Sequence, residues 1–257
     1  MITRRGRALV AALVLVVAVA GVAPAVADAT WRPKMRPAVR WSNDRQGSVS
    51  FAVKDPRGRI HTHRAATEVP MASTLKVMFM VAYLRQDSVR RRGLRDSDRK
   101  LLAPMIRRSD NYTATRIADQ LGPRPINRLA RKAKMRDFSY TRPWGLSRSS
   151  ARDQARFMFR LKKFIPRRHR GYARWLLAHV TASQRWGIGK VKTPDWTKLF
   201  KGGWGSGSGA VDHQIVLLKR NDGTRVALAV MTTSSPSHAY AKRTLRGTFA
   251  RLLRRLP

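Results

Sequence analysis

The sequence predicts a single α+β domain in which an antiparallel sheet is built from both ends of the chain, with a helical lobe inserted between them. A hairpin pattern lies over residues 48–63, helical patterns fill the middle of the chain, and a second hairpin pattern lies over residues 211–232. A basic amphipathic helix is expected after the last strand. Because sheets and helices that each bury one face pack in layers around a shared core, these patterns favour one domain.

The expected strands are short runs of β-branched and aromatic residues bounded by turn signals. Residues 48–53 and 59–63 flank Asp55-Pro56-Arg57-Gly58, and residues 211–218 and 225–232 flank Asn221-Asp222-Gly223. An Asp-Gly pair between strands is a strong hairpin signal, since glycine reaches positive φ without steric cost. Helices are expected over residues 74–85, 97–107, 112–120, 125–134, 148–163, 172–181 and 239–256.

The chain begins with a pattern typical of a secretory signal peptide. Three arginines precede an apolar stretch over residues 8–20, and small residues follow. We therefore expect a signal peptide over residues 1–29, a basic segment over 30–45 and the folded domain over 46–257. The product is expected to be secreted or associated with the cell envelope. The paired arginines leave a twin-arginine route open, and an uncleaved N-terminal anchor is the other alternative.

Positive charge is the second unusual property of the sequence. The chain has 54 Lys+Arg and 14 Asp+Glu, a formal net charge of +40. An exported protein this basic is expected to adhere to anionic envelope polymers or phospholipid headgroups, unless arginine merely replaces other solvated polar residues through a compositional bias. No basic stripe with stacking aromatics and no nucleic-acid-binding module is found, so a nucleic-acid partner is not expected. We expect a monomer.

The chain has no cysteine, which excludes thiol catalysis, thiolate metal sites and disulfides. Three short motifs in a fixed order carry chemistry instead: Ser73-Thr74-Leu75-Lys76, Ser109-Asp110-Asn111 and Lys201-Gly202-Gly203-Trp204. The first places a hydroxyl and an amine one helical turn apart, so that the amine can accept the proton of the hydroxyl. The second offers another hydroxyl and a carboxamide, and the third a lysine before flexible backbone at a strand edge. Together they predict an active-site serine enzyme.

A second Ser-x-x-Lys pattern, Ser97 to Lys100, lies among polar residues and predicts an ordinary helix start with a capping serine. Ser73 instead precedes the apolar run 77–84, which is long enough for a buried helix. A nucleophile at the start of such a helix lies near the positive end of the helix dipole, on a rigid support. The structural alternative is that Ser73 caps the helix and Lys76 lies in a solvated first turn.

From about Gln46 to the C-terminus, the chain resembles the class A β-lactamase and penicillin-binding-protein superfamily. Besides the three motifs in order, residues 68–76 are close to the nucleophile segment of class A enzymes, and residues 149–153 are similar to the segment that follows their omega loop. The resemblance implies a β-lactamase/transpeptidase-like fold and an exported serine hydrolase. Its substrate would be a β-lactam or a peptidoglycan-type peptide, and no metal or cofactor would be needed.

The resemblance also implies the catalytic roles. Ser73 would be the nucleophile, Lys76 its proton acceptor, and Ser109 the relay of a proton to the leaving nitrogen. The backbone N–H groups of Ser73 and Trp204 would form the oxyanion hole, whose donors are often the largest catalytic term. Asn111 would hold the substrate amide.

In the third motif, the resemblance implies that Lys201 attracts the substrate carboxylate and that Gly202 and Gly203 contact the substrate. Gly202 stands where the family has a hydroxyl residue, which removes one donor for that carboxylate. Either Lys219 or Arg225 could compensate, although both are typical of solvated charges at strand edges.

A carboxylate is missing where class A β-lactamases carry the omega-loop glutamate that activates the deacylating water. Residues 138–148 contain no acidic residue, and Glu68 is the only glutamate of the chain. Asp137 borders the gap and Asp153 lies beyond it, but their spacing does not support a substitution, and Asp153 is expected to be a helix-start carboxylate. Deacylation is therefore expected to be slow.

Several alternatives remain open from the sequence alone. His61 and His63 share one face of an expected strand and could form a metal pair, but no third ligand follows. The protein could also be a pseudoenzyme that binds wall peptide without turnover, or an envelope-binding protein driven by charge alone.

Overall fold

The central element of the fold is a five-stranded antiparallel sheet in the order β2-β1-β7-β6-β5. The computed structural model describes residues 31–205, 207 and 209–256, so the expected signal peptide over 1–29 lies outside the described residues. The strands of this sheet are β1 (Ser48–Lys54), β2 (Ile60–His63), β5 (Thr197–Gly205), β6 (Val211–Lys219) and β7 (Arg225–Thr233). A separate two-stranded sheet joins β3 (Val69–Pro70) to β4 (Arg148–Ser149).

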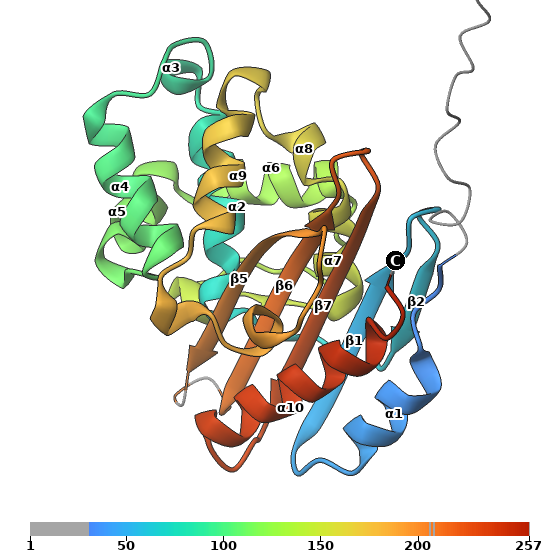
Figure 1. Cartoon of the computed structure of the whole chain (residues 1–257). Coiled ribbons are helices and arrows are strands. Elements are labelled where there is room, and N and C mark those ends of the chain that lie inside the picture. The colour runs from blue at the N-terminus through green and yellow to red at the C-terminus, as the bar shows by residue number, and fades with distance from the viewer. Residues whose placement is uncertain (1–30, 206, 208, 257) are drawn as a thin grey trace, which may run out of the picture.

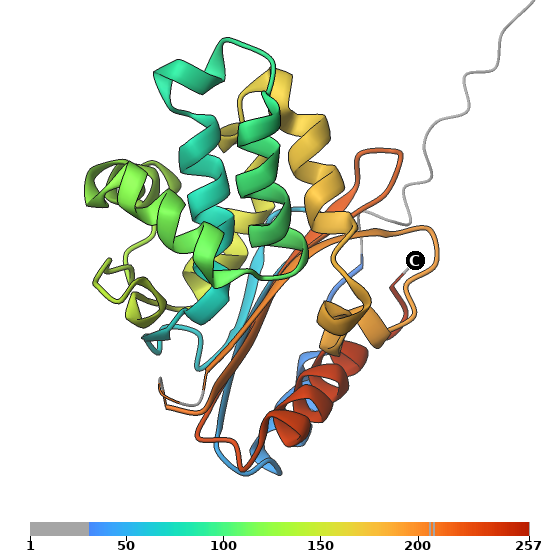
Figure 2. The same cartoon turned by 90° about the vertical axis from the view of Figure 1, so that its left-hand side faces the viewer.

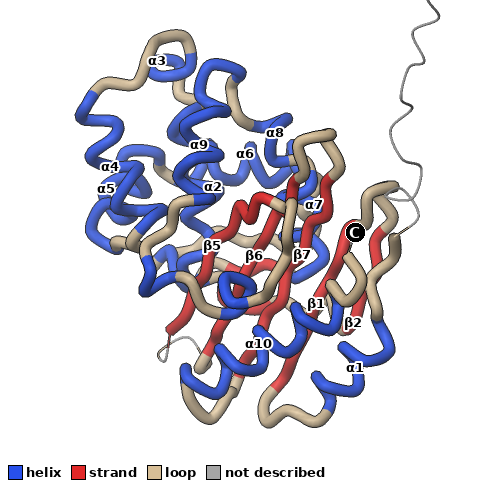
Figure 3. The backbone as a smooth tube through the Cα atoms, viewed as in Figure 1, coloured by secondary structure: helices blue, strands red, loops and turns tan. Residues whose placement is uncertain are grey.

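The helices comprise α1 (Met35–Asn43), α2 (Lys76–Leu84), α3 (Asp87–Arg90), α4 (Asp96–Arg107), α5 (Asn111–Leu121), α6 (Pro123–Ala133), α7 (Ala151–Phe159), α8 (Leu161–Phe164), α9 (Arg170–Ala178) and α10 (His238–Leu252). In Figure 1, α1 and α10 lie in front of the large sheet, and the other helices form the lobe above and behind it. The turned view in Figure 2 shows the sheet between these two layers. The tube in Figure 3 separates the helical lobe from the strands by colour.

Pairing between the two ends of the chain closes the sheet. β1 pairs with β7 over its whole length, with Phe51 opposite Val230, and its five central residues are buried. Both expected hairpin turns are present, because Gly58 and Gly223 take φ values of +77° and +93°. The predicted α+β class, with a sheet drawn from both chain ends, is confirmed.

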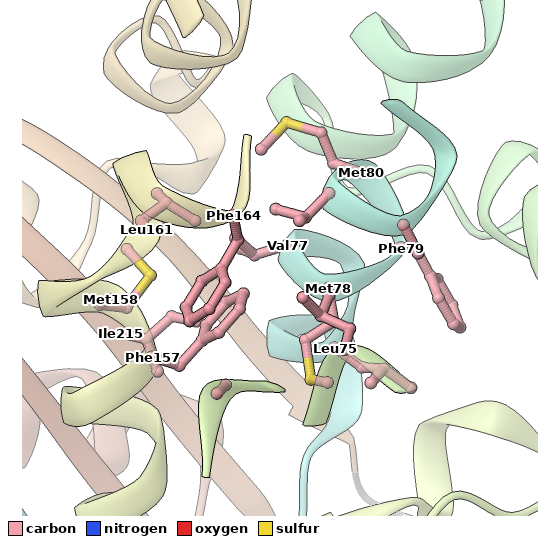
Figure 4. Close-up of a cluster of buried hydrophobic side chains, with 14 of the residues drawn as sticks. Leu75, Val77, Met78, Phe79, Met80, Phe157, Met158, Leu161, Phe164 and Ile215 are labelled. Atoms are coloured by element: carbon pink, nitrogen blue, oxygen red, sulfur yellow. The ribbon is translucent and has the colours of Figure 1, made fainter. Parts of the chain in front are cut away.

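Two hydrophobic clusters hold the layers together. The cluster on the lobe side is centred on α2, all nine of whose residues are buried. Figure 4 shows Val77 of α2 with Phe157 and Phe164 of the α7–α8 region, and Phe157 and Phe164 stack at 5.6 Å between ring centroids. The other cluster joins the sheet to α10. Because α2 is surrounded by apolar side chains, it is a rigid support for the residues at its start.

Two segments differ from what the sequence predicts. The expected basic segment 30–45 contains α1, which packs on α10, and Trp31 is buried in the core, so the fold begins before residue 46. The expected helix over 148–163 divides into β4, α7 and α8, since Ser150 caps a new helix through a bond from the Asp153 N–H.

In the part of the chain that the structure describes, no helix has the length and apolarity needed to cross a membrane.

Candidate active site

The segment that carries Ser73 is fixed on both sides. Ser73 lies in a 3₁₀ turn over Ala72–Leu75 that continues directly into α2. The Met71 N–H donates to the Ser147 carbonyl at 2.7 Å, and Ala72 has a φ of +45°. Non-glycine residues rarely occupy that region, and such strain is concentrated at functional sites. Ser73 is therefore held at the entrance of a buried helix rather than in a solvated turn.

His213 fixes the same segment from the sheet. Its Nδ1 accepts from the Thr232 N–H at 3.2 Å, so its Nε2 carries the hydrogen that is donated to the Pro70 carbonyl at 2.8 Å. Burial lowers the pKa of His213 to about 4, so the ring stays neutral and keeps this tautomer. This link joins β6 and β7 to the strand that precedes Ser73.

Lys76 is buried beside the second motif. Its Nζ donates to the Asn111 Oδ1 at 2.7 Å and to the Ser109 carbonyl at 2.5 Å, and it lies 3.4 Å from the Ser109 Oγ. Burial lowers the pKa of Lys76 to about 7, although the carboxylate of Asp110 acts in the opposite direction. An amine with this pKa is neutral in a large fraction of molecules at neutral pH and can accept a proton.

The second motif is shaped by its own backbone. Ser109 takes a φ of +62°, and Asp110 caps α5 by accepting from the Thr113 N–H at 2.7 Å. Asn111 is the first residue of that helix. The cap turns the Asn111 carboxamide and the Ser109 hydroxyl toward the start of α2, where Lys76 meets both.

Lys201 reaches Ser109 from the sheet. Its Nζ donates to the Ser109 Oγ at 2.8 Å and to the Gly202 carbonyl at 2.7 Å, and only 1% of the residue is exposed. Burial, with the charge of Lys76 as a smaller cause, lowers the pKa of Lys201 well below its ordinary value. In this geometry Lys201 holds the Ser109 hydroxyl, and its attraction for a substrate carboxylate stays a prediction.

The two glycines of the third motif are required by close contacts on opposite sides of β5. A Cβ on Gly203 would lie 2.7 Å from the Ser73 nitrogen, so only glycine lets the strand pass this close to the nucleophile. A Cβ on Gly202 would lie 2.5 Å from the ring of Trp186. Trp186 therefore fills the space that a hydroxyl side chain at position 202 would need.

Neither Lys219 nor Arg225 replaces the hydroxyl donor that is missing at position 202. Lys219 pairs with Thr197 at the start of β5, whereas Trp204 pairs with Asp212 at its other end. Arg225 lies opposite Lys219, and its guanidinium covers the ring of Phe159. Both basic residues therefore lie at the end of the sheet that is remote from the third motif.

No pattern in the sequence indicates the contacts of His238 that support the end of β5. The His238 Nδ1 lies 2.5 Å from the Asp212 Oδ1, and its ring lies 4.8 Å from that of Trp204 and 5.7 Å from that of Trp186. Burial raises the pKa of Asp212 to about 6, and the bond to His238 opposes that shift. His238 thus connects the start of α10 to both tryptophans that flank the Gly202-Gly203 pair.

A cleft of about 500 Å³ opens beside Ser73. Its wall combines Asn111 and Thr115 of α5, the 143–146 segment and Trp204. The ring of Trp144 lies 5.1 Å from the Lys76 Nζ, and its Nε1 donates to the Thr115 Oγ1 at 3.0 Å. No acidic side chain is among the described residues that line this cleft.

The acidic residues nearest in sequence have other partners. Asp153 is fully buried and accepts from the Asp137 N–H at 2.7 Å, while Asp137 binds Arg152 at 2.9 Å and the Ser150 hydroxyl at 2.6 Å. This network holds the start of α7, as expected of a helix-start carboxylate. Glu68 is half-exposed beside Arg148 and does not line the cleft.

His61 and His63, which the sequence left open as a possible metal pair, have separate contacts. His61 Nε2 lies 2.9 Å from the Asp55 carboxylate, whereas the His63 ring packs at 5.1 Å from that of Phe51. Within the described ranges, no group of three potential ligands is placed to hold a metal ion.

Comparison with known proteins agrees with this fold. A model described as the Beta-lactamase enzyme family matches residues 88–255, and the chain belongs to this family. The matched residues include Ser109, Asn111 and Lys201. Ser73 and Lys76 precede the matched residues, so their assignment depends on the geometry of the site. A search of curated proteins gave no match.

Solved class A β-lactamases share the fold. The β-lactamase of Sphaerobacter thermophilus superposes with a TM-score of 0.72 at 18% identity, covering 84% of this chain and 94% of that one. The class A β-lactamase of Mycobacterium abscessus gives 0.71 at 19% identity, covering 84% and 96%. An ancestral class A β-lactamase gives 0.72 at 18% identity, covering 84% and 96%.

Proposed function

We propose that this protein is an exported serine hydrolase that forms an acyl-enzyme on Ser73 with β-lactams or peptidoglycan-type peptides and releases the acyl group slowly. The family and the fold support a serine hydrolase. The observation that carries the proposal is the buried amine of Lys76, with its pKa lowered to about 7 and its bonds to Ser109 and Asn111. No metal or cofactor takes part.

In the proposed acylation, neutral Lys76 takes the proton of the Ser73 hydroxyl, and the Ser73 Oγ attacks the amide carbonyl carbon. The carbonyl electron pair moves to oxygen, where the backbone N–H groups of Ser73 and Trp204 stabilise the oxyanion. As the tetrahedral intermediate collapses, the C–N bond breaks and Ser109 donates its proton to the leaving nitrogen. Ser109 regains a proton from one of the two lysines that contact its hydroxyl.

Release of the acyl group needs a second nucleophile, either water or an amine. In class A β-lactamases, which this chain resembles, an omega-loop glutamate activates water. Here Trp144 covers Lys76, and the cleft is lined without a carboxylate among its described residues. These features support slow deacylation.

The basic composition and the N-terminal pattern support export and contact with anionic envelope polymers. We place the protein outside the cytoplasm, as a monomer with no nucleic-acid partner.

Intact-mass spectrometry after incubation with a penicillin tests the proposal. We expect the mass of wild-type protein to increase by that of the whole β-lactam, because ring opening expels no fragment, and Ser73→Ala to show no increase. A pseudoenzyme would bind wall peptide without forming the adduct. An envelope-binding protein driven by charge alone would show wall binding that is sensitive to salt and the same in Ser73→Ala.

A further inference from the structure

A basic hollow, which we call the α2–α6 groove, lies at the opposite end of α2 from Lys76. It encloses about 640 Å³ between the α2–α3 junction and α6. Its charged and amide side chains are Arg85, Gln86, Asp87, Arg90, Arg128 and Lys132. The length of α2 separates the groove from Lys76 by roughly 13 Å, so a ligand there leaves the Ser73 cleft open.

The positive charge of the groove is largely uncompensated. Asp87 is the only carboxylate among its lining residues, and it pairs with Arg90 at 2.8 Å. Arg128 and Lys132 lie one turn apart on the exposed face of α6, a helix without a single acidic residue. Neither has an ion pair within the described part of the chain. Like charges one turn apart destabilise a helix, so an anion between them would relieve a repulsion that the fold now carries.

The scaffold of the groove is ordered by the fold. The Arg85 Nη1 donates to the Phe164 carbonyl at 3.0 Å, which fixes one guanidinium at the rim. The face of α6 that packs on the lobe is anchored by Ile126 and Ala130, both buried in the core on the lobe side. Gln86 also lines the groove, and its carboxamide Nε2 is buried without a hydrogen-bond partner. Several cations on ordered elements suit a ligand that offers several anionic oxygens.

We propose that the α2–α6 groove binds a phosphate group, with Arg128 and Lys132 as the residues that recognise its oxygens. A guanidinium offers two parallel N–H donors that match phosphate geometry, and a nearby ammonium adds a point charge. A carboxylate has fewer oxygens and less charge and engages fewer of these donors. The proposal is independent of the chemistry at Ser73, so either can fail without the other.

The test is an NMR titration of wild-type protein with glycerol 3-phosphate, with acetate at equal ionic strength as the control anion. We expect the Gln86 carboxamide signal to shift with glycerol 3-phosphate and not with acetate. The double variant Arg128→Gln/Lys132→Gln should bind at least about tenfold more weakly, since charge-assisted bonds are lost. The matched control is Arg246→Gln/Arg254→Gln, which removes the same charge from two exposed arginines, one on α10 and one just after it. This control should change the affinity by less than about twofold.

Equal losses in the two double variants would mean that overall charge, and not the groove, attracts phosphate. Equal shifts with acetate, or no shift with millimolar glycerol 3-phosphate, would also overturn the proposal. Vesicles that contain phosphatidylglycerol distinguish the sources of the phosphate. If the groove variant loses vesicle binding and the control does not, the natural source is a lipid headgroup, and if only the soluble phosphate depends on the groove, the source is a free phosphate ester.

Discussion

At the scale of single residues, the chain carries two Ser-x-x-Lys patterns, and their surroundings separate them. Ser73 and Lys76 lie at the start of the buried α2, whereas Ser97 and Lys100 are exposed on α4. Ser97 is not the capping residue that the sequence suggests. The Asp98 carboxylate accepts from the Arg95 N–H at 2.7 Å, because Arg92 and Tyr83 hold that carboxylate in place.

We predict that a mechanism-based β-lactam labels Ser73 alone. Ser73 combines a strained backbone entry at Ala72 with a buried lysine one turn away, whereas the lysine one turn from Ser97 is exposed. Peptide mapping of the labelled protein checks this. Ser97→Ala should keep full labelling and Ser73→Ala should lose it, and a label on Ser97 in either protein would refute the assignment.

The pH dependence of acylation should follow Lys76. Since burial lowers the pKa of Lys76 to about 7, the amine is protonated and inactive as a base below that value and neutral above it. The second-order acylation rate constant should therefore rise through pH 7 and level off at higher pH. Stopped-flow measurements with a chromogenic cephalosporin would give this profile.

The variant Lys76→Met should lose this rise and fall by roughly 10² to 10⁴ in rate, since a general base is removed. The matched control is Lys100→Met, the exposed lysine of the second pattern, which should keep the wild-type profile. A rise through pH 7 that survives in Lys76→Met would assign the titration to another group.

At the scale of secondary-structure elements, β5 is the one that the cleft depends on most. Its neighbours on both sides come from distant parts of the chain: Ser73 touches it at Gly203, and Trp186 touches it at Gly202. The missing hydroxyl at position 202 was visible in the sequence. The reason for the missing hydroxyl, which is the Trp186 ring, could not be read from the sequence. Trp186 lies in a loop before β5, and no sequence pattern relates its position to the motif.

We predict that Gly202→Ser, which restores the hydroxyl residue of the family, destabilises this protein. The new side chain meets the Trp186 ring, and overpacking of this kind costs about 1 to 3 kcal/mol in the free energy of unfolding. Denaturant unfolding measures that loss. Gly93→Ser is the control, since nothing lies within 4 Å of a Cβ at that position.

Combining Gly202→Ser with Trp186→Leu should recover part of the lost stability relative to the two single changes, because both residues act on one contact. Strictly additive losses in this double-mutant cycle would show that Trp186 is not the obstacle.

At the scale of the whole molecule, the sequence predicted a sheet built from both chain ends with a helical lobe inserted between them. Periodicity and turn residues located both hairpins and most helices, because these signals are local. Contacts between residues far apart in the chain could not be predicted. They include the burial of Lys201, the His238–Asp212 contact and the packing of α1 on α10. The motif residues were identified by their order, and only the fold revealed that Ser109 lies between the two lysines.

The assembled cleft leads to the last prediction, that β-lactam hydrolysis is limited by deacylation. Four separate segments form its wall, and none of their described residues supplies a carboxylate to activate water. General-base assistance is worth roughly 10² to 10⁴ in rate, so its absence should let the acyl-enzyme accumulate. The adduct should persist in intact-mass spectra after excess drug is removed by desalting.

Trp144 allows a direct test of this prediction, because its ring lies over Lys76 and lines the cleft beside Ser73. Trp144→Ala should admit water and shorten the lifetime of the adduct. Trp175→Ala, which removes an exposed indole on α9, should leave that lifetime unchanged. Rapid steady-state turnover by wild-type protein, with no detectable adduct, would mean that a residue outside the described lining activates water. A lifetime that is equal in Trp144→Ala and Trp175→Ala would show that access of water past the indole does not limit deacylation.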